Sequence, residues 1–317
     1  MRLRANLAAD AVLVLVTLVW GSTFVFGKDI LDRWPPISYM AARLVLAAAL
    51  LALLFRRQLR EATARAWKAG AVLGVLIGAG LAGQATGLAY TTPAKSAFIS
   101  GLTTPLVPFV AYLLLRARPS RENLAGIILA SIGGALILAP AEAALVNAGD
   151  LITLSTTVLF AAHISLMSAY ARRYDVRQLS ALQVTTAAAL ILGVWLAVRG
   201  FAALAGEGAL PQGLAREAAP LAWSPAAAWQ LVYLSLVATV GTFMLWTWGQ
   251  ARMSATHAAV IFSLEPVFAT LFAVLVRGSA EWTGGRATAG AVLIVAGVIV
   301  SELSWDRSQS RERQRAG

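Results

Sequence analysis

Long apolar stretches follow one another along nearly the whole chain, separated by short polar segments. A helix that crosses a bilayer needs about 20 mostly apolar residues. Segments of this kind run approximately over residues 11–27, 36–55, 69–91, 95–115, 122–140, 149–170, 177–198, 225–249, 255–276 and 284–304. The longest connection, 199–224, is rich in Ala, Gly and Pro and is expected to form one flexible external loop. The pattern predicts an all-α integral membrane protein with ten transmembrane helices.

The composition supports lipid as the main solvent of this chain. Of its 317 residues, 59% are hydrophobic and only 13% are charged, whereas about a quarter of the residues of a soluble domain are charged. The first apolar segment follows Arg2 and Arg4 but lacks a small-residue cleavage site. It is therefore expected to be retained as a span rather than removed as a signal peptide. Cys is absent, which excludes disulfides, thiolate catalysis and cysteine metal sites.

The positions of the Lys and Arg residues predict the orientation of the chain. If the N-terminus lies inside, most of the 26 Lys and Arg residues fall on the inner side, including those of 56–68, 116–121 and 172–177. Cytoplasmic loops carry such a positive excess. We therefore expect a multi-pass protein of the plasma (inner) membrane with both termini in the cytoplasm. The same placement explains the net charge of +11 and the basic tail, 305–317, without a nucleic-acid partner.

The two halves of the chain, 1–140 and 149–304, resemble each other. The matching positions are Asp10 with Asp150, Trp20 with Phe160, the run Ser96–Pro105 with His257–Pro266, and Gly126 and Gly133 with Gly290 and Gly297. Each half contains five predicted spans. Because five is odd, the second half must lie upside down relative to the first, as in the inverted repeats of many secondary transporters. In such folds the solute binds near the middle of the membrane, between the halves.

Short motifs stand out in the first, second, fourth and ninth spans. They are Trp20-Gly21-Ser22-Thr23-Phe24, Ala42-Arg43, Pro105 and Leu264-Glu265-Pro266. In order and spacing they resemble the EamA family of the drug/metabolite transporter superfamily, over essentially the whole chain. The resemblance implies two inverted five-helix repeats and secondary export of amino acids or other metabolites, with the YddG-type aromatic amino-acid exporters as the nearest branch. The second repeat departs from the first at His163, which stands where the first repeat has Thr23.

Two ionisable residues lie deep within predicted spans, where such groups need partners or water. Glu265 lies near the middle of the ninth span, and Arg43 lies in the second span, nearer its outer end. In a transporter, Glu265 could carry a coupling proton or meet an ammonium group, and Arg43 could meet a carboxylate. Alternatively, each residue could pair with polar groups of neighbouring helices, or with the other, and serve only packing.

Prolines occur at matched positions of the fourth and ninth spans. Pro105, Pro108 and Pro266 each remove a helical hydrogen bond. Membranes tolerate such breaks where neighbouring helices or a water-lined cavity satisfy the freed backbone groups. The prolines therefore indicate hinges or a solute site. Thr103 and Thr104 add hydroxyl groups beside Pro105, although these hydroxyls could also bond only to their own helix.

The remaining candidates for a cavity lining are aromatic or polar residues within spans, namely Trp20, Ser22, Thr23, Gln84, Tyr90 and His163. Trp usually marks the membrane interface, and Trp20 lies too deep for that role. The tryptophans expected at the interface are Trp34, Trp223, Trp246, Trp248 and Trp305. His163 could contact a proton or the solute, or only fill a packing position, and His257 is expected near the cytoplasmic interface.

These features predict a secondary transporter that exports small metabolites, most of all amino acids with apolar or aromatic side chains, by alternating access of a central cavity. The sequence contains no HExxH motif, no aspartate pair within a span and no Walker A phosphate loop. An intramembrane enzyme and ATP-driven transport are therefore disfavoured, and no cofactor or metal is expected. The expected partners are the solute, the bilayer and protons, and such a fold can work as a monomer. Two alternatives stay open: a carrier that takes up or exchanges another metabolite or drug, and a non-transporting scaffold.

Overall fold

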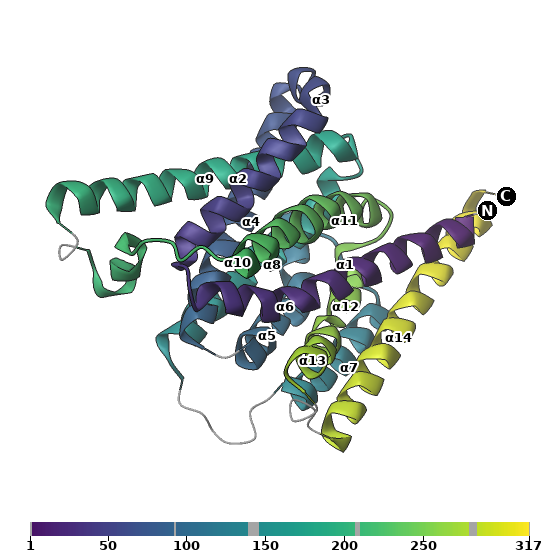
Figure 1. Ribbon diagram of the computed structural model, residues 1–317. Helices are drawn as coiled ribbons and strands as arrows, with labels where there is room; N and C mark the ends of the chain where they lie inside the picture. The colour runs from purple at the N-terminus through teal and green to yellow at the C-terminus, as the bar shows by residue number, and fades with distance from the viewer. Residues whose placement is uncertain (1, 92, 139–145, 207–209, 279–283, 317) are drawn as a thin grey trace.

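The computed structural model describes residues 2–91, 93–138, 146–206, 210–278 and 284–316, and this part of the chain contains helices and no strands. The first half contains α1 (Arg2–Leu31), α2 (Pro36–Leu54), α3 (Arg56–Arg60), α4 (Ala64–Tyr90), α5 (Pro93–Gly101), α6 (Thr103–Leu115) and α7 (Arg121–Leu138). The second contains α8 (Ala148–Tyr170), α9 (Val176–Ala205), η2 (Gln212–Ala218), α10 (Pro225–Ser235), η3 (Leu236–Gly241), α11 (Thr242–Gln250), α12 (Ala255–Phe262), α13 (Glu265–Arg277) and α14 (Gly285–Ala316). In the view of Figure 1, the start of α1 and the end of α14 lie at the same edge of the molecule.

Eight helical segments of the described residues are long and apolar enough to cross a membrane. They are Leu7–Leu31, Pro36–Leu54, Ala64–Tyr90, Ser96–Leu115, Ala148–Tyr170, Val176–Ala205, Pro225–Gln250 and Ala255–Val276. The other two predicted spans coincide with α7 and with Gly285–Ser301 of α14, which is apolar but shorter. The chain is thus a multi-pass helical membrane protein, and the count of ten spans stays a prediction.

Polar residues begin several of the helices. At the start of α8, Asn147 and Asp150 form a capping box, in which each side chain accepts a hydrogen bond from the backbone amide of the other, at 3.0 and 2.9 Å. Side chains also cap α4, α9, α10 and α12; they belong to Thr63, Asp175, Ser224 and Ser254. The first amides of a helix have no partner within it, so these caps define where each helix begins.

Three of the spanning segments are interrupted. α5 ends at Gly101 shortly before Pro105, and α12 ends at Phe262 shortly before Pro266. The helix continues through Pro108, which lies inside α6. The third interruption is η3, a π-helical turn between α10 and α11. A π-helical turn changes which carbonyl oxygens the helix itself uses, so η3 can offer oxygens to other groups.

Glycines bring α7 and α14 into close contact. A Cβ atom on Gly126 would lie 2.7 Å from the carbonyl oxygen of Gly297, and one on Gly133 would lie 2.5 Å from that of Gly290. Real Cβ atoms do not come this close to other atoms, so only glycine permits this approach of two backbones. Gly126, the earlier glycine of α7, meets Gly297, the later glycine of α14, and Gly133 meets the earlier Gly290. The two helices therefore run antiparallel.

The segment between α9 and α10 is held against the bundle at residues 210–224, so the flexibility expected of this connection is wrong there. Its place on the external side stays a prediction. Its turn η2 places the carboxylate of Glu217, a residue only 2% exposed, at the start of α2. There it accepts hydrogen bonds from the backbone amides of Ile37 and Ser38, at 2.8 and 3.0 Å. The Trp34 indole, which was expected at the interface, is buried and donates to the carbonyl oxygen of Ala222.

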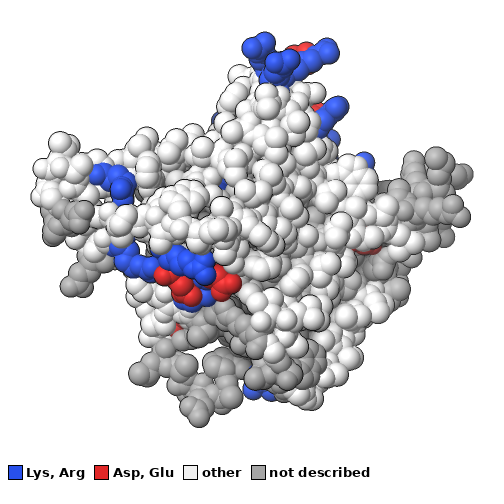
Figure 2. Space-filling view, in the orientation of Figure 1, with Lys and Arg blue, Asp and Glu red and all other residues white. Residues whose placement is uncertain are grey.

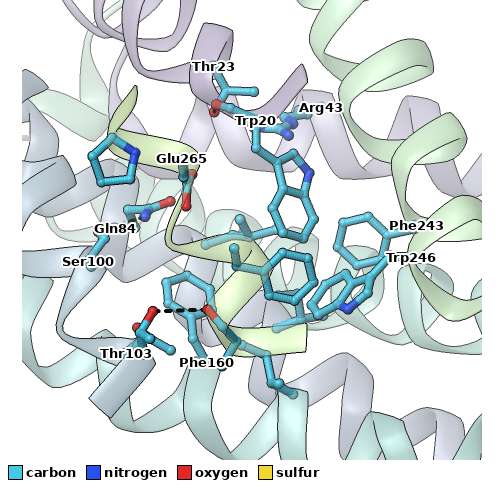
Figure 3. A pocket seen from close by; sticks show the side chains of 18 residues that line it. Trp20, Thr23, Arg43, Gln84, Ser100, Thr103, Phe160, Phe243, Trp246 and Glu265 are labelled. Carbon is cyan, nitrogen blue, oxygen red and sulfur yellow. Dashed lines mark hydrogen bonds between the residues drawn. The ribbon is translucent and has the colours of Figure 1, made fainter. Parts of the chain in front are cut away.

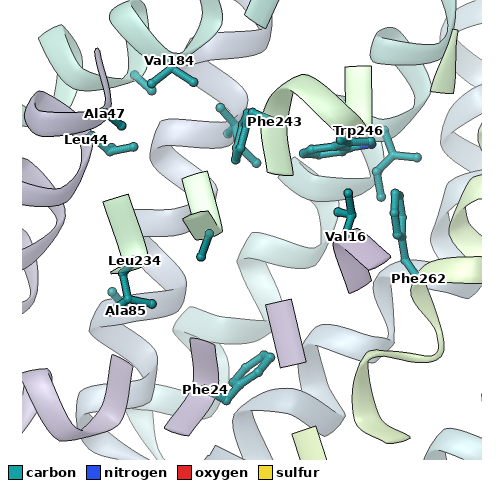
Figure 4. Packing of buried hydrophobic residues seen from close by; sticks show 14 of the residues in the cluster. Val16, Phe24, Leu44, Ala47, Ala85, Val184, Leu234, Phe243, Trp246 and Phe262 are labelled. Atoms are coloured by element: carbon teal, nitrogen blue, oxygen red, sulfur yellow. The ribbon is translucent and has the colours of Figure 1, made fainter. Parts of the chain in front are cut away.

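Apolar side chains fill the interior and also cover much of the outside. Figure 4 shows part of the buried cluster, to which Phe24 of α1, Leu44 of α2, Val184 of α9 and Leu234 of α10 belong. In Figure 2 the charged side chains gather at separate places, including the tip formed by α3 and the region of η2, and a broad uncharged surface lies between them. This distribution suits a protein whose sides face lipid.

Candidate functional site

A cavity of about 100 Å³ lies inside the bundle, where helices from both halves of the chain converge (Figure 3). Its lining includes eight residues that the sequence suggested: Trp20, Thr23, Arg43, Gln84, Thr103, Thr104, Glu265 and Pro266. The other residues that line it are Ile77, Leu81, Ser100, Gly101, Phe160, Ile164, Phe243, Trp246, Ala259 and Phe262. The cavity therefore combines a mostly apolar wall with two ionisable groups.

One wall of the cavity is aromatic. The ring of Trp20 lies edge to face against that of Trp246, with centroids 4.8 Å apart, and 5.4 Å from that of Phe262. The Trp20 indole nitrogen donates a hydrogen bond to Thr242 Oγ1 at 3.1 Å, which fixes the ring. Trp246 is 2% exposed, so its expected place at the interface is wrong. Such a wall can contact an apolar side chain or offer a ring face to a cation.

Arg43 supplies a buried positive charge. Its Nε donates to the carbonyl oxygen of Leu234 and to Thr239 Oγ1, at 3.1 and 2.9 Å. Its Nη1 and Nη2 donate to the Tyr39 hydroxyl and to the carbonyl oxygen of Ala238, both at 3.2 Å. The three oxygens of the second half lie in or beside η3. No carboxylate pairs with this guanidinium among the described residues.

Glu265 supplies the carboxylate. It is the first residue of α13, and its side chain points into the cavity (Figure 3). Within the described part of the chain, no hydrogen bond or ion pair joins this side chain to Arg43 or to another side chain. The pair that the sequence allowed between these two residues is therefore not formed. A carboxyl group inside a membrane without a protein partner can take up a proton or meet a cationic group.

Hydroxyl and amide groups occupy the rest of the lining. Gln84 Nε2 donates to Ser100 Oγ at 2.9 Å, which joins α4 to α5. Thr104 Oγ1 donates to the carbonyl oxygen of Ala259 at 3.2 Å, which joins α6 to α12 beside both helix breaks. The hydroxyl of Thr103 has no partner in the residues that the structure describes. The Thr103 hydroxyl is thus free to bond to a solute or to water.

Several residues suggested by the sequence lie outside the lining. Ser22 faces α10, where its hydroxyl and that of Tyr233 are 2.8 Å apart. Tyr90 lies at the end of α4 and is 45% exposed. Pro105 and Pro108 belong to α6 but do not border the cavity. These four residues therefore do not meet a solute in the cavity as it stands.

The two histidines are buried in separate places. His163 lies behind the aromatic wall, 4.6 Å from the ring of Trp246, and its Nε2 bonds to Gln183 Oε1 at 2.9 Å. His257, expected at the interface, is 4% exposed and lies between Asp10 Oδ1, at 3.1 Å from Nε2, and Ser301 Oγ, at 2.9 Å from Nδ1. The contact with Asp10 connects residues far apart in the chain, so sequence spacing could not reveal it.

The aromatic residues of the second half were the main omission from the residues suggested by the sequence. Of these, Phe160 could have been found, because it matches Trp20 in the repeat. Phe243 and Phe262 carry no comparable signal, since apolar residues are common on every span. No group of His, Asp or Glu suited to a metal ion is present in the described residues. The arrangement is that of a binding cavity for a modest-sized solute with apolar and charged parts.

Comparison with known proteins places the chain in a family. The model of the EamA-like transporter family matches residues 7–139 and again residues 147–303. The chain therefore belongs to the EamA-like transporter family, and this membership identifies it as a transporter.

Two of the relatives are named as transporters, without a substrate. An uncharacterized transporter of Archaeoglobus fulgidus is 30% identical over 94% of this chain and 87% of its own length. The uncharacterized transporter YoaV of Bacillus subtilis is 23% identical over 93% of this chain and 97% of its own. A protein of known crystal structure, 19% identical, superposes with a TM-score of 0.70 over 94% of this chain and 98% of its own, and so shares the fold.

Proposed function

We propose that this protein is a secondary transporter that exports amino acids, most of all those with apolar or aromatic side chains, across the plasma membrane. The central cavity is exposed alternately to each side as two inverted five-helix repeats move against each other. Both termini lie in the cytoplasm. The observation that carries the proposal is the cavity itself, in which a buried guanidinium, a carboxylate without a protein partner and an aromatic wall face one space.

The packing of α7 against α14 supports the inverted repeat. In the alignment of the two halves, Gly126 corresponds to Gly290 and Gly133 to Gly297. In the structure, Gly126 meets Gly297 and Gly133 meets Gly290. Each contact is thus turned into the other when the two halves are exchanged, which is what a two-fold axis between inverted repeats requires.

The interrupted helices support motion around the cavity. The α5–α6 break and the α12–α13 break stand at matching places in the two repeats, beside Pro105 and Pro266. Thr104 and Glu265, which match in the alignment, both line the cavity. Broken helices at the interface between repeats commonly form the binding site of secondary transporters. We infer that these breaks act as hinges between the two access states.

The two charges support an amphipathic solute with a carboxylate and an ammonium group. Arg43 has more N–H groups than the four acceptors it contacts, so it can still meet a carboxylate. Glu265 can meet the ammonium group or carry the coupling proton. The aromatic rings of Trp20 and Phe262 then contact the apolar side chain. An amino acid has these three features, and the cavity lining offers a group for each.

Flux from proteoliposomes tests the proposal. Vesicles are loaded with a panel of radiolabelled amino acids, and efflux is compared for wild type, Glu265→Gln and Glu61→Gln, with and without a pH gradient. Glu61 lies outside the cavity in an exposed pair with Arg57, so Glu61→Gln is the matched control. We expect efflux of leucine and phenylalanine that the gradient accelerates in wild type and in the control, but not in Glu265→Gln.

Other outcomes discriminate between the alternatives. Efflux that depends on neither the gradient nor Glu265 would identify a facilitator and assign Glu265 to packing. Absence of efflux for every amino acid, from protein that elutes as a folded species, would refute the substrate class. The same vesicles would then be loaded with other metabolites, and a chain that moves none of them would be a scaffold.

A further inference from the structure

A second pocket is bordered by α6, α8 and α12, three of the helices that also line the central cavity. It has a volume of about 370 Å³ and lies where the ends of α6 and α8 meet the start of α12. It is lined by Ala111, Leu115, Ala117, Arg118, Pro119, Asn123, Ser168, Ala169, Arg172, Arg173, Ser254, Ala255 and Thr256. The positive excess of the loops assigns this end to the cytoplasm.

The lining of this pocket, which we call the cytoplasmic pocket, is strongly positive. Arg118, Arg172 and Arg173 border it, and no Asp or Glu is among its lining residues in the described part of the chain. Arg172 is fixed at the edge by a 2.8 Å hydrogen bond from Nη2 to the carbonyl oxygen of Met253. The first turn of α12, at Ala255, also borders it, and the start of a helix carries a partial positive charge.

The cytoplasmic pocket continues the line of the central cavity. On α8 the cavity is bordered by Ile164 and the pocket by Ser168, one helical turn away. On α12 the cavity is bordered by Ala259 and the pocket by Ala255, again one turn away. On both helices the residues that border the two spaces are thus only one turn apart.

Arginines at cytoplasmic ends also serve to orient a membrane protein, and α3 provides the comparison. Arg56 and Arg60 of α3 are exposed on the same side of the membrane, but they border none of the pockets described above. Orientation by positive charge requires no pocket. The three arginines around one concave space therefore call for a ligand as well.

We propose that the cytoplasmic pocket is an entry site for the carboxylate of a solute that arrives from the cytoplasm, before the solute passes to the central cavity. The proposal rests on the proposed function and names the anionic group that the cytoplasmic entrance selects. Anionic solutes concentrate where guanidinium groups line a concave surface. The carboxylate is held there by Arg118 and Arg173, whose side chains bond to no other group of the described residues, while Arg172 stays bonded to Met253.

A thiol probe tests the pocket independently of transport. Because the chain has no Cys, Ala117→Cys gives a single thiol on the lining. The measured quantity is the ratio of its reaction rates with a negatively and a positively charged methanethiosulfonate. We expect Arg118→Gln with Arg173→Gln to lower this ratio by about tenfold, since two positive charges are removed near the thiol. Arg56→Gln with Arg60→Gln removes the same charge from α3 and should leave the ratio unchanged.

Protection of the same thiol identifies the ligand. In vesicles of neutral phosphatidylcholine, leucine should slow the labelling of the probe protein, and leucinamide, which lacks the carboxylate, should not. The protection should disappear in the Arg118→Gln, Arg173→Gln background. If only vesicles containing anionic phosphatidylglycerol slow the labelling, the pocket binds a lipid headgroup and the proposal is overturned. An unchanged rate ratio in the double variant overturns it as well.

Transport from the two sides completes the test. In the absence of any gradient, kcat/KM for leucine must stay equal in the two directions. The double variant should lower it by about tenfold in both, through a higher KM from the cytoplasmic face and a lower kcat from the opposite face. An unchanged KM from the cytoplasmic face would overturn the entry role. If no amino acid is transported at all, the proposed function fails, but the charge dependence of the labelling still decides whether the pocket attracts anions.

Discussion

The attachment of Glu217 to the start of α2 predicts a large effect of one conservative substitution. Glu217→Gln keeps the size and shape of the side chain and removes its charge. The carboxylate accepts three hydrogen bonds, from the amide of Ile37 at 2.8 Å and from the amide and hydroxyl of Ser38 at 3.0 and 2.9 Å. An amide side chain has only one acceptor oxygen, so its NH₂ group would face donors that now lack an acceptor.

The magnitude follows from these contacts. Leaving a buried donor without an acceptor costs about 1–3 kcal/mol. Loss of a negative charge at the start of a helix costs about 0.3–1 kcal/mol more, and up to about 2 kcal/mol when partly buried. Since Glu217 is 2% exposed, we expect Glu217→Gln to lower the free energy of unfolding by about 2–4 kcal/mol. A further consequence is faster tryptic cleavage after Arg216, because η2 is then held less firmly.

The assay is SDS-induced unfolding of the purified protein in mixed micelles, with tryptic cleavage measured in parallel. Glu61→Gln is the control, since it makes the same chemical change where the side chain is 60% exposed, and it should leave both quantities unchanged. If Glu217→Gln unfolds with the same free energy as wild type and the control, the carboxylate does not anchor the segment. The segment between α9 and α10 would then not be held by its bonds to the start of α2.

Two further substitutions test the packing of the spans. Gly133→Ala should lower the free energy of unfolding by about 1–3 kcal/mol, because its Cβ would lie 2.5 Å from the carbonyl oxygen of Gly290. The control Gly134→Ala should be neutral or slightly stabilising, since a Cβ there meets no atom within 4 Å. Equal effects of the two substitutions would contradict the close approach of α7 and α14. Arg43→Lys should lower the free energy of unfolding by about 2–4 kcal/mol in the same assay, because one ammonium group cannot reach the four acceptors of the guanidinium. The control Arg56→Lys, on the exposed α3, should leave it unchanged. An Arg43→Lys protein as stable as wild type would show that these hydrogen bonds contribute little.

The sequence alone pointed to those cavity residues that are of an unusual type for the middle of a membrane span. Arg43 and Glu265 stand out because ionisable groups are costly inside a membrane. Trp20 stands out because it lies deeper than the interface, and Pro266 because it interrupts a span. All four border the cavity. Their roles in binding or transport remain predictions.

The residues that the sequence did not reveal are ordinary for their surroundings. Phe243 and Trp246 are apolar residues of an apolar span, and which side of the helix faces the cavity depends on the packing of its neighbours. The partners of Arg43 lie about η3, in the other half of the chain, and a π-helical turn has no simple sequence signal. Glu217 lies in a connection rich in Ala, Gly and Pro, where an acidic residue is expected to be exposed.

The sequence by itself determined that this chain is a helical membrane protein, approximately where its apolar segments run, and that its halves match. It could do so because the thickness of the bilayer sets the length of an apolar span and because misplaced charges are costly there. Only the tertiary structure decided which side chains share the cavity, what holds Arg43, how the segment between α9 and α10 is attached and that three arginines border one pocket. These depend on contacts between helices far apart in the chain, and in a membrane such contacts arise from shape and hydrogen bonding, which a pattern of apolar residues does not encode.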